Sequence, residues 1–223
     1  MNKQTVIFLD HLKNERNYSP QTIDSYSRDI DKFFKYLSKE GVLMDEVDLL
    51  IVRNFLTEEL QKGVSKRSCK RRFSSLKHFY AYMVQEEMAK INPFLVATSP
   101  KSDKKLPQVL YKQQIETLIF ENQKRTDPLA ERDKAILELL YFSGIRAAEL
   151  VNLDVQHVDL SNRLIRVFGK GRKERIVPFS KTCKESLKKY IDNLRKDLII
   201  KNKEFCNALF LNNRGNRLTT RGL

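Results

Sequence analysis

The chain has 223 residues, of which 41% are hydrophobic and 31% are charged, so it can bury a core and does not have a disordered composition. No apolar run approaches the ~20 residues of a membrane-spanning helix, and the N-terminus does not resemble a signal peptide, so we expect a cytoplasmic protein. With 42 basic and 28 acidic residues, the net charge of +14 favours a polyanionic partner, nucleic acid above all.

The first hundred residues predict helices. Ser19 and Pro20 form a helix start, an apolar helical period follows, and Gly41 is a typical helix end. A second helix is predicted from Asp48 to about Gly63. The N-terminal part is therefore expected to be an all-helical domain.

A third predicted helix starts at Ser65, with apolar residues on one face and cations on the other. The cations crowd its first half: Lys66, Arg67, Lys70, Arg71, Arg72 and Lys77. Such a helix can pack on its own domain while its basic face contacts a phosphate backbone. An ordinary solvated face would show the same pattern, so the helix alone leaves both interpretations open.

A change in composition predicts a domain boundary. The stretch around Pro93, Pro100 and Pro107 has no helical or strand period between residues 97 and 106. We expect a helical domain at 1–96, a linker at 97–106 and a second domain at 107–223. The cations Lys101, Lys104 and Lys105 suggest that the linker also lies near a polyanion.

The second region predicts a mixed α+β domain. Two helices precede Gly144, and "AAELVNL" forms a short helix after it. The alternating segments "HVDL", "RLIRVFG" and "ERIVPF", with turns at Asn162 and at 169–171, predict a three-stranded antiparallel meander. A single helix over "TCKESLKKYIDNLRKDLI" and a short strand in "ALFLNN" follow. The predicted fold class is mainly α with two domains, the second carrying a small antiparallel sheet.

The excess of positive charge lies mainly in the second region. Residues 1–100 hold 16 basic and 13 acidic side chains, whereas residues 101–223 hold 26 basic and 15 acidic side chains.

The cysteines Cys69, Cys183 and Cys206 are distant from one another and form no CxxC pair. Neither a disulfide framework nor a metal or other cofactor is therefore expected.

Several stretches resemble a known family. "YFSGIRAAELVNL", "IRVFGKGRKERIVPF" and "LFLNNRGNRLT" resemble the catalytic domain of tyrosine site-specific recombinases of the phage integrase family, most closely the Xer type. "YSPQTIDSYSRDIDKFFKYL" and "SSLKHFYAYMVQEEMAKINP" resemble the SAM-like core-binding domain of that family. The resemblance covers nearly the whole chain in order, and GIRxxEL followed by GKGxKER is a specific pair.

The resemblance implies a reaction and its residues. In the family a tyrosine attacks a phosphodiester without metal or nucleotide, forming a 3′-phosphotyrosine and a free 5′-hydroxyl. Arg146 matches the first catalytic arginine, and an arginine stays protonated while its planar fork binds two phosphate oxygens. Lys170 matches the hairpin lysine that protonates the leaving oxygen. Glu149 is expected to orient the active-site donors, although an ordinary helix-face carboxylate is nearly as good an interpretation. Arg172, Lys173 and Arg175 are expected to contact DNA phosphates or to be surface charge.

Other family residues find no match in these 223 residues. His11, His78 and His157 lie in no HxxR box, and we expect them to be structural or on the surface. Tyr141 and Tyr190 precede the place of that box, so neither matches the nucleophile. The expectation is a C-terminally incomplete catalytic domain, truncated before the HxxR box, that binds DNA but cannot cleave it alone.

The resemblance also implies partners. The family assembles four protomers on two duplex DNA sites, so the full-length relative is expected to form homo- or hetero-tetramers, in chromosome-dimer resolution or element integration. A non-enzymatic DNA-binding protein is the alternative, and the sequence beyond Leu223 would discriminate. RNA binding is disfavoured because no RNP1 motif or KH-type GxxG clamp occurs.

Overall fold

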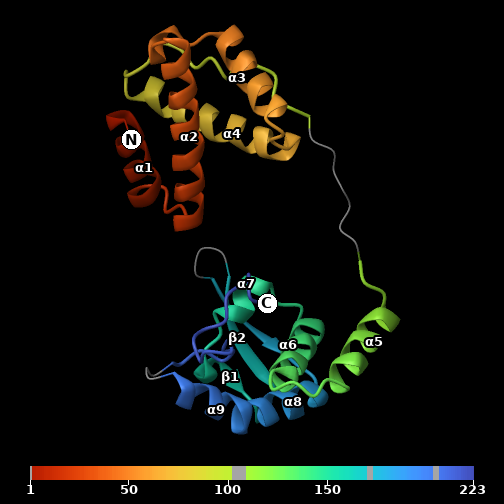
Figure 1. Cartoon of the computed structure of the whole chain (residues 1–223). Helices are drawn as coiled ribbons and strands as arrows, with labels where there is room; N and C mark the ends of the chain where they lie inside the picture. Colours follow the sequence, from red (N-terminus) through yellow and green to blue (C-terminus); the bar gives the residue numbers. More distant parts are fainter. Residues whose placement is uncertain (1, 102–108, 170–172, 203–205) are drawn as a thin grey trace. The chain divides into compact units, whose positions relative to one another are not determined.

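The computed structural model describes residues 2–101, 109–169, 173–202 and 206–223 (Figure 1). The chain divides into two compact units, Met1–Pro107 and Gln108–Leu223. Each unit has its own hydrophobic core. Among the helices within these ranges, none combines the length and the apolar character needed to cross a membrane.

The first unit is helical, as predicted. Its elements are α1 (Lys3–Asn14), α2 (Pro20–Glu40), the 3-10 helix η1 (Met44–Glu46), α3 (Leu49–Gln61) and α4 (Lys66–Gln85). The side chains of Ser19, Asp48 and Ser65 each accept a backbone N–H three residues further on, which satisfies a free donor of the helix start. Gly41 ends α2 with a φ of +68°, a conformation that glycine adopts without strain.

Aromatic packing holds this unit together. Phe33 on α2 is fully buried, and its ring makes edge-on contacts with Phe55, Tyr80 and Phe94. Phe94 lies beyond α4, so the segment after that helix belongs to the same core. Asn92 ties this segment down by donating a 3.0 Å hydrogen bond to the Lys77 carbonyl.

The second unit combines helices with a small sheet (Figure 1). Its elements are α5 (Lys112–Gln123), α6 (Ala130–Ser143), α7 (Ala147–Val151), η2 (Val155–His157), β1 (Val158–Asp159), β2 (Leu164–Phe168), β3 (Glu174–Pro178), α8 (Lys181–Asp192) and α9 (Leu194–Lys201). The strands pair antiparallel in the order β1-β2-β3, which confirms the predicted meander. Ile165 and Val167 on β2 are buried in the same core as Leu139 on α6 and Leu187 on α8. The core thus fixes the sheet against these helices.

The predicted single helix after β3 was wrong, because two helices occupy that stretch. Asn193, with φ −109° and ψ −98°, leaves the helical region between α8 and α9. Two residues later, the buried Arg195 donates hydrogen bonds of 2.7 to 3.2 Å to the carbonyls of Cys206, Ala208 and Leu209. These contacts hold α9 against the following segment, and a helix continuing straight from α8 could not make them.

The predicted strand in "ALFLNN" is also reduced. Ala208 and Leu211 form only isolated bridges, to Asp154 and Arg217 respectively. The chain turns at Gly215, which has a φ of +81°, and a Cβ there would lie 2.2 Å from the Leu198 carbonyl oxygen. Only glycine therefore allows this turn to pack on α9.

Candidate active site

A sharp helix end delivers Arg146 to the surface. α6 stops at Gly144, whose φ is +61° and whose N–H donates to the Leu140 carbonyl at 3.0 Å. Ile145 is buried in the core, and Arg146 follows in extended conformation as the N-cap of α7. The Arg146 side chain is 77% exposed. A cation is thus presented to solvent by a backbone anchored on both sides.

The buried carboxylate of Glu149 lies at the start of α7. Its Oε2 accepts the Arg146 backbone N–H at 2.8 Å, and its Oε1 accepts from Arg146 Nη1 at 3.1 Å. The anion at this helix start is therefore the protein's own carboxylate. Hydrogen bonds from Arg175, followed by those from Arg146, lower the pKa of Glu149 to about 2 even though burial opposes the shift.

Arg175 on β3 joins the hairpin to the same carboxylate. Its Nη1 and Nη2 donate to Glu149 Oε1 and Oε2, each at 2.8 Å, so the pair is bidentate. Gly169, at the end of β2, lies beside the pair: a Cβ there would be 3.5 Å from Arg175 Nη1 and 3.6 Å from Glu149 Oε1. The structure therefore brings Arg146, Glu149, Arg175 and the end of the β2–β3 hairpin together.

The turn of that hairpin holds two further predicted site residues. Lys170 and Arg172 lie outside the described residues, as do Lys104 and Lys105 of the predicted linker. The residues that flank the turn are joined by a 2.8 Å hydrogen bond from Gly169 N–H to the Lys173 carbonyl. Lys173 itself is exposed.

The basic face of α4 is smaller than the sequence predicted. Lys66, Arg67 and Lys70 are exposed, Lys77 is partly buried, and Lys101 of the predicted linker is exposed. Arg71 makes a bidentate ion pair with the buried Asp29. Its side chain is still 48% exposed.

Arg72 requires a correction. It is buried between helices, where Glu59 on α3 and Asp29 on α2 face its guanidinium. A cation enclosed in this way presents no donors to a DNA phosphate, so we withdraw it from the predicted DNA-binding residues. Nothing in the helical period marked Asp29 or Glu59 as partners, because both positions read as ordinary helix-face carboxylates.

The histidines and Tyr190 make structural contacts. Tyr190 is fully buried, its hydroxyl accepts the Leu211 N–H at 3.1 Å, and burial raises its pKa to about 12. His157 Nδ1 accepts the Asp154 N–H at 3.0 Å. His78 Nδ1 lies 3.1 Å from the Tyr26 hydroxyl. His11 Nδ1 lies 3.0 Å from a Glu15 carboxylate oxygen.

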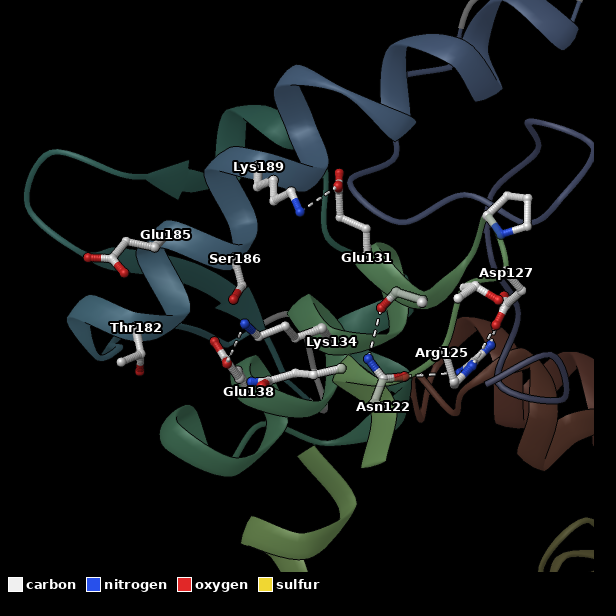
Figure 2. A pocket seen from close by; sticks show the side chains of 14 residues that line it. Asn122, Arg125, Asp127, Glu131, Lys134, Glu138, Thr182, Glu185, Ser186 and Lys189 are labelled. Atoms are coloured by element: carbon white, nitrogen blue, oxygen red, sulfur yellow. Dashed lines mark hydrogen bonds and ion pairs between the residues drawn. The ribbon is translucent and has the colours of Figure 1, made fainter. Parts of the chain in front are cut away.

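A cavity of about 740 Å³ opens elsewhere in the second unit, between the α5–α6 connection, α6 and α8 (Figure 2). Six of its charged side chains form three ion pairs: Lys189 with Glu131 at 3.4 Å, Lys134 with Glu138 at 3.9 Å and Arg125 with Asp127 at 2.7 Å. Within the described ranges, no group of three His, Cys, Asp or Glu residues is placed to hold a metal ion. Because mixed and paired charges do not concentrate a positive field, the candidate site for a phosphate is Arg146.

Known families and proteins match both units. Residues 108–223 match the phage integrase family, and residues 6–87 match the phage integrase N-terminal SAM-like domain. The tyrosine recombinase XerC of Bacillus licheniformis is 40% identical over 218 residues, which cover 97% of this chain and 71% of the relative. The XerC of Thermodesulfovibrio yellowstonii is also 40% identical, over 96% of this chain and 70% of the relative.

Solved structures show the same fold. The Tn1549 transposon integrase in complex with circular intermediate DNA matches with a TM-score of 0.72 at 21% identity, covering 98% of this chain and 74% of that one. The XerH recombinase bound to its palindromic difH substrate matches with a TM-score of 0.70 at 23% identity, covering 93% and 61%. The chain therefore belongs to the phage integrase family, as a homologue of the XerC tyrosine recombinases.

Proposed function

We propose that this chain acts in site-specific DNA recombination, as part of a Xer-like tyrosine recombinase whose full-length relatives cut and rejoin duplex DNA. Support comes from relatives that are named tyrosine recombinases and align with nearly the whole chain. The observation that carries the proposal is the placement of Arg146. Arg146 follows the end of α6, and its guanidinium is exposed. Glu149 links it to the hairpin that contains the GKGxKER motif.

The proposed reaction transfers one phosphoryl group twice. A tyrosine oxygen attacks the phosphorus atom, a 3′-phosphotyrosine bond forms, and the bond to the 5′-oxygen breaks. Arg146 stabilises the charge that builds up on the nonbridging oxygens, and Lys170 gives its proton to the leaving 5′-oxygen. A 5′-hydroxyl from the partner strand then attacks the phosphotyrosine and releases the tyrosine.

In this reaction, residues 1–223 bind the DNA and activate the phosphate. They contain no match to the HxxR box or to the nucleophilic tyrosine, so we propose that they bind duplex DNA without cutting it. Both the domain at 1–96 and the domain at 107–223 contact the duplex, and the linker at 97–106 joins them. When full length, four protomers act together on two sites in the cytoplasm, as in the family.

Salt-dependent binding to selected DNA tests this proposal. Selection from a pool of random-sequence duplexes should converge on a shared sequence. In a plot of the logarithm of the association constant against the logarithm of the salt concentration, each phosphate contact should contribute about −0.9 to the slope. Lys70→Ala should reduce that slope by about 0.9, whereas Lys35→Ala, which removes an exposed lysine paired with Asp31 on α2, should not. A pool that stays random, or an affinity indifferent to salt, would contradict the proposal.

A further inference from the structure

We infer that Arg175 is a positioning residue that occupies Glu149 and so keeps Arg146 free to bind a DNA phosphate. The inference rests on the proposed function, and it replaces the expectation that Arg175 itself contacts DNA. Glu149 is a buried anion only three residues from Arg146, so the two could neutralise each other. Arg146 nevertheless makes only one side-chain hydrogen bond with Glu149.

Two hydrogen bonds from Arg175 limit the contact between Glu149 and Arg146. Both terminal nitrogens of Arg175 donate to Glu149 at 2.8 Å, one to each oxygen. Arg146 makes a single side-chain contact with the same carboxylate, at the longer distance of 3.1 Å. Each oxygen of Glu149 accepts one hydrogen bond from the fork of Arg175, and Oε2 also accepts the Arg146 backbone N–H, so that a single acceptor position is left for the Arg146 side chain. That side chain stays 77% exposed.

The same contacts leave Arg175 poorly placed to bind a phosphate. A phosphate that took the two terminal nitrogens of Arg175 would strip a buried carboxylate of its principal partner, and an unpaired buried charge is strongly unfavourable. Gly169 lies beside the pair, where an added Cβ would make ordinary van der Waals contact with Arg175 Nη1 at 3.5 Å and with Glu149 Oε1 at 3.6 Å. The geometry thus assigns Arg175 to Glu149 and Arg146 to the DNA.

Removal and rescue test this division of roles. In Arg175→Met, Glu149 should capture Arg146, and duplex affinity should fall about tenfold, the scale of one lost charge-assisted hydrogen bond. Adding Glu149→Gln removes the capturing anion and should restore most of that affinity. Arg146→Ala should lower affinity in the wild-type protein but have little further effect in Arg175→Met.

The matched control is Arg166→Met. Arg166 is an exposed arginine of the same hairpin, but it pairs with Glu174 at 3.2 Å rather than with Glu149. Its replacement should lower affinity less, and Glu149→Gln should not rescue it. If Arg175 contacted a phosphate, the loss of duplex affinity in Arg175→Met would persist when Glu149→Gln is added. If the role of Arg175 were only structural, Glu149→Gln alone would lower duplex affinity as much as Arg175→Met does. Either outcome would overturn the inference.

A measurement without DNA separates this inference from the proposed function. NMR relaxation of the Arg146 Nε–H group in the free protein should show a mobile side chain in the wild type and a more rigid one in Arg175→Met. Glu149→Gln, which folds with an uncharged side chain of the same shape, should leave Arg146 mobile. Unchanged mobility in Arg175→Met would reject capture, whether or not the wild-type chain binds DNA. Should Arg175→Met fail to fold, the same comparison is made with Arg175→Lys, which lacks the bidentate fork.

Discussion

The arginines of this chain serve different purposes that their type alone does not reveal. Arg195 and Arg132 are buried and donate to backbone carbonyls of residues 206–211. Arg72 is buried against carboxylates of neighbouring helices. Arg146 is exposed, and its backbone is held in place by the end of α6. A count of positive charges therefore overstates how many can meet a phosphate.

The role of Arg146 can be tested in a chimera in which the C-terminal segment of Bacillus licheniformis XerC follows Leu223. Arg146→Ala should slow formation of the covalent DNA complex by roughly a hundred- to a thousandfold, because a fixed donor to the transition state is lost. Duplex affinity should fall far less. Arg166→Ala serves as the control for loss of a nearby cation. Equal losses of binding and cleavage in Arg146→Ala would exclude the assigned catalytic role.

Lys170 has a separate signature in the same chimera. Lys170→Ala removes the proposed proton donor, so its cleavage defect should be largely relieved by a 5′-thio leaving group, which departs without protonation. The Arg146→Ala defect should remain on that substrate, because charge on the nonbridging oxygens still has to be stabilised. Failure of the thio substrate to rescue Lys170→Ala would pass the candidate acid role to Lys173.

At the scale of elements, local signals predicted most of the fold, and the misses have physical causes. Helix starts at Ser19 and Ser65 and the antiparallel meander were confirmed, because caps and alternation act within a few residues. The break at Asn193 was missed, since Arg195 just after it binds carbonyls 11 to 13 residues further along the chain, which no local pattern predicts. The pairing of Arg175 with Glu149 was missed for the same reason: its partners lie 26 residues apart.

The end of α6 offers a test at this scale. Gly144 has a φ of +61° and no neighbouring atom within 4 Å of an added Cβ, so only backbone strain opposes a side chain there. Gly144→Ala should lower the free energy of unfolding by about 1–2 kcal/mol, and Gly144→Asn by less, since asparagine tolerates this conformation better. Urea unfolding of the three proteins measures the order. An alanine variant as stable as the wild type would show that this helix end relaxes.

For the whole molecule, the two units depend on separate cores. One cluster draws its residues from positions 8–94, centred on aromatic side chains of α2 to α4. The other draws its residues from positions 135–218 and links the sheet to α6 and α8. A core substitution in one unit should therefore leave the packing of the other unchanged, which allows each to be studied by itself.

Limited proteolysis tests the predicted linker. Residues 98–101 lie outside helices and strands. Proteases cut most readily in exposed segments whose backbone can detach locally from the folded protein. Trypsin should cut first near Lys101, Lys104 or Lys105 and leave an N-terminal fragment of roughly a hundred residues. Mass spectrometry of early time points identifies the sites. First cuts within α4, between residues 66 and 73, would argue against this boundary.

The low pKa of Glu149 bears on how the reaction would respond to acidity. A carboxyl with a pKa of about 2 is ionised throughout the physiological range. The charge of Glu149 is therefore constant from mildly acidic to mildly basic solution. A bell-shaped pH–rate profile for strand cleavage would consequently report the general acid and the nucleophile, and not the groups that bind the phosphate.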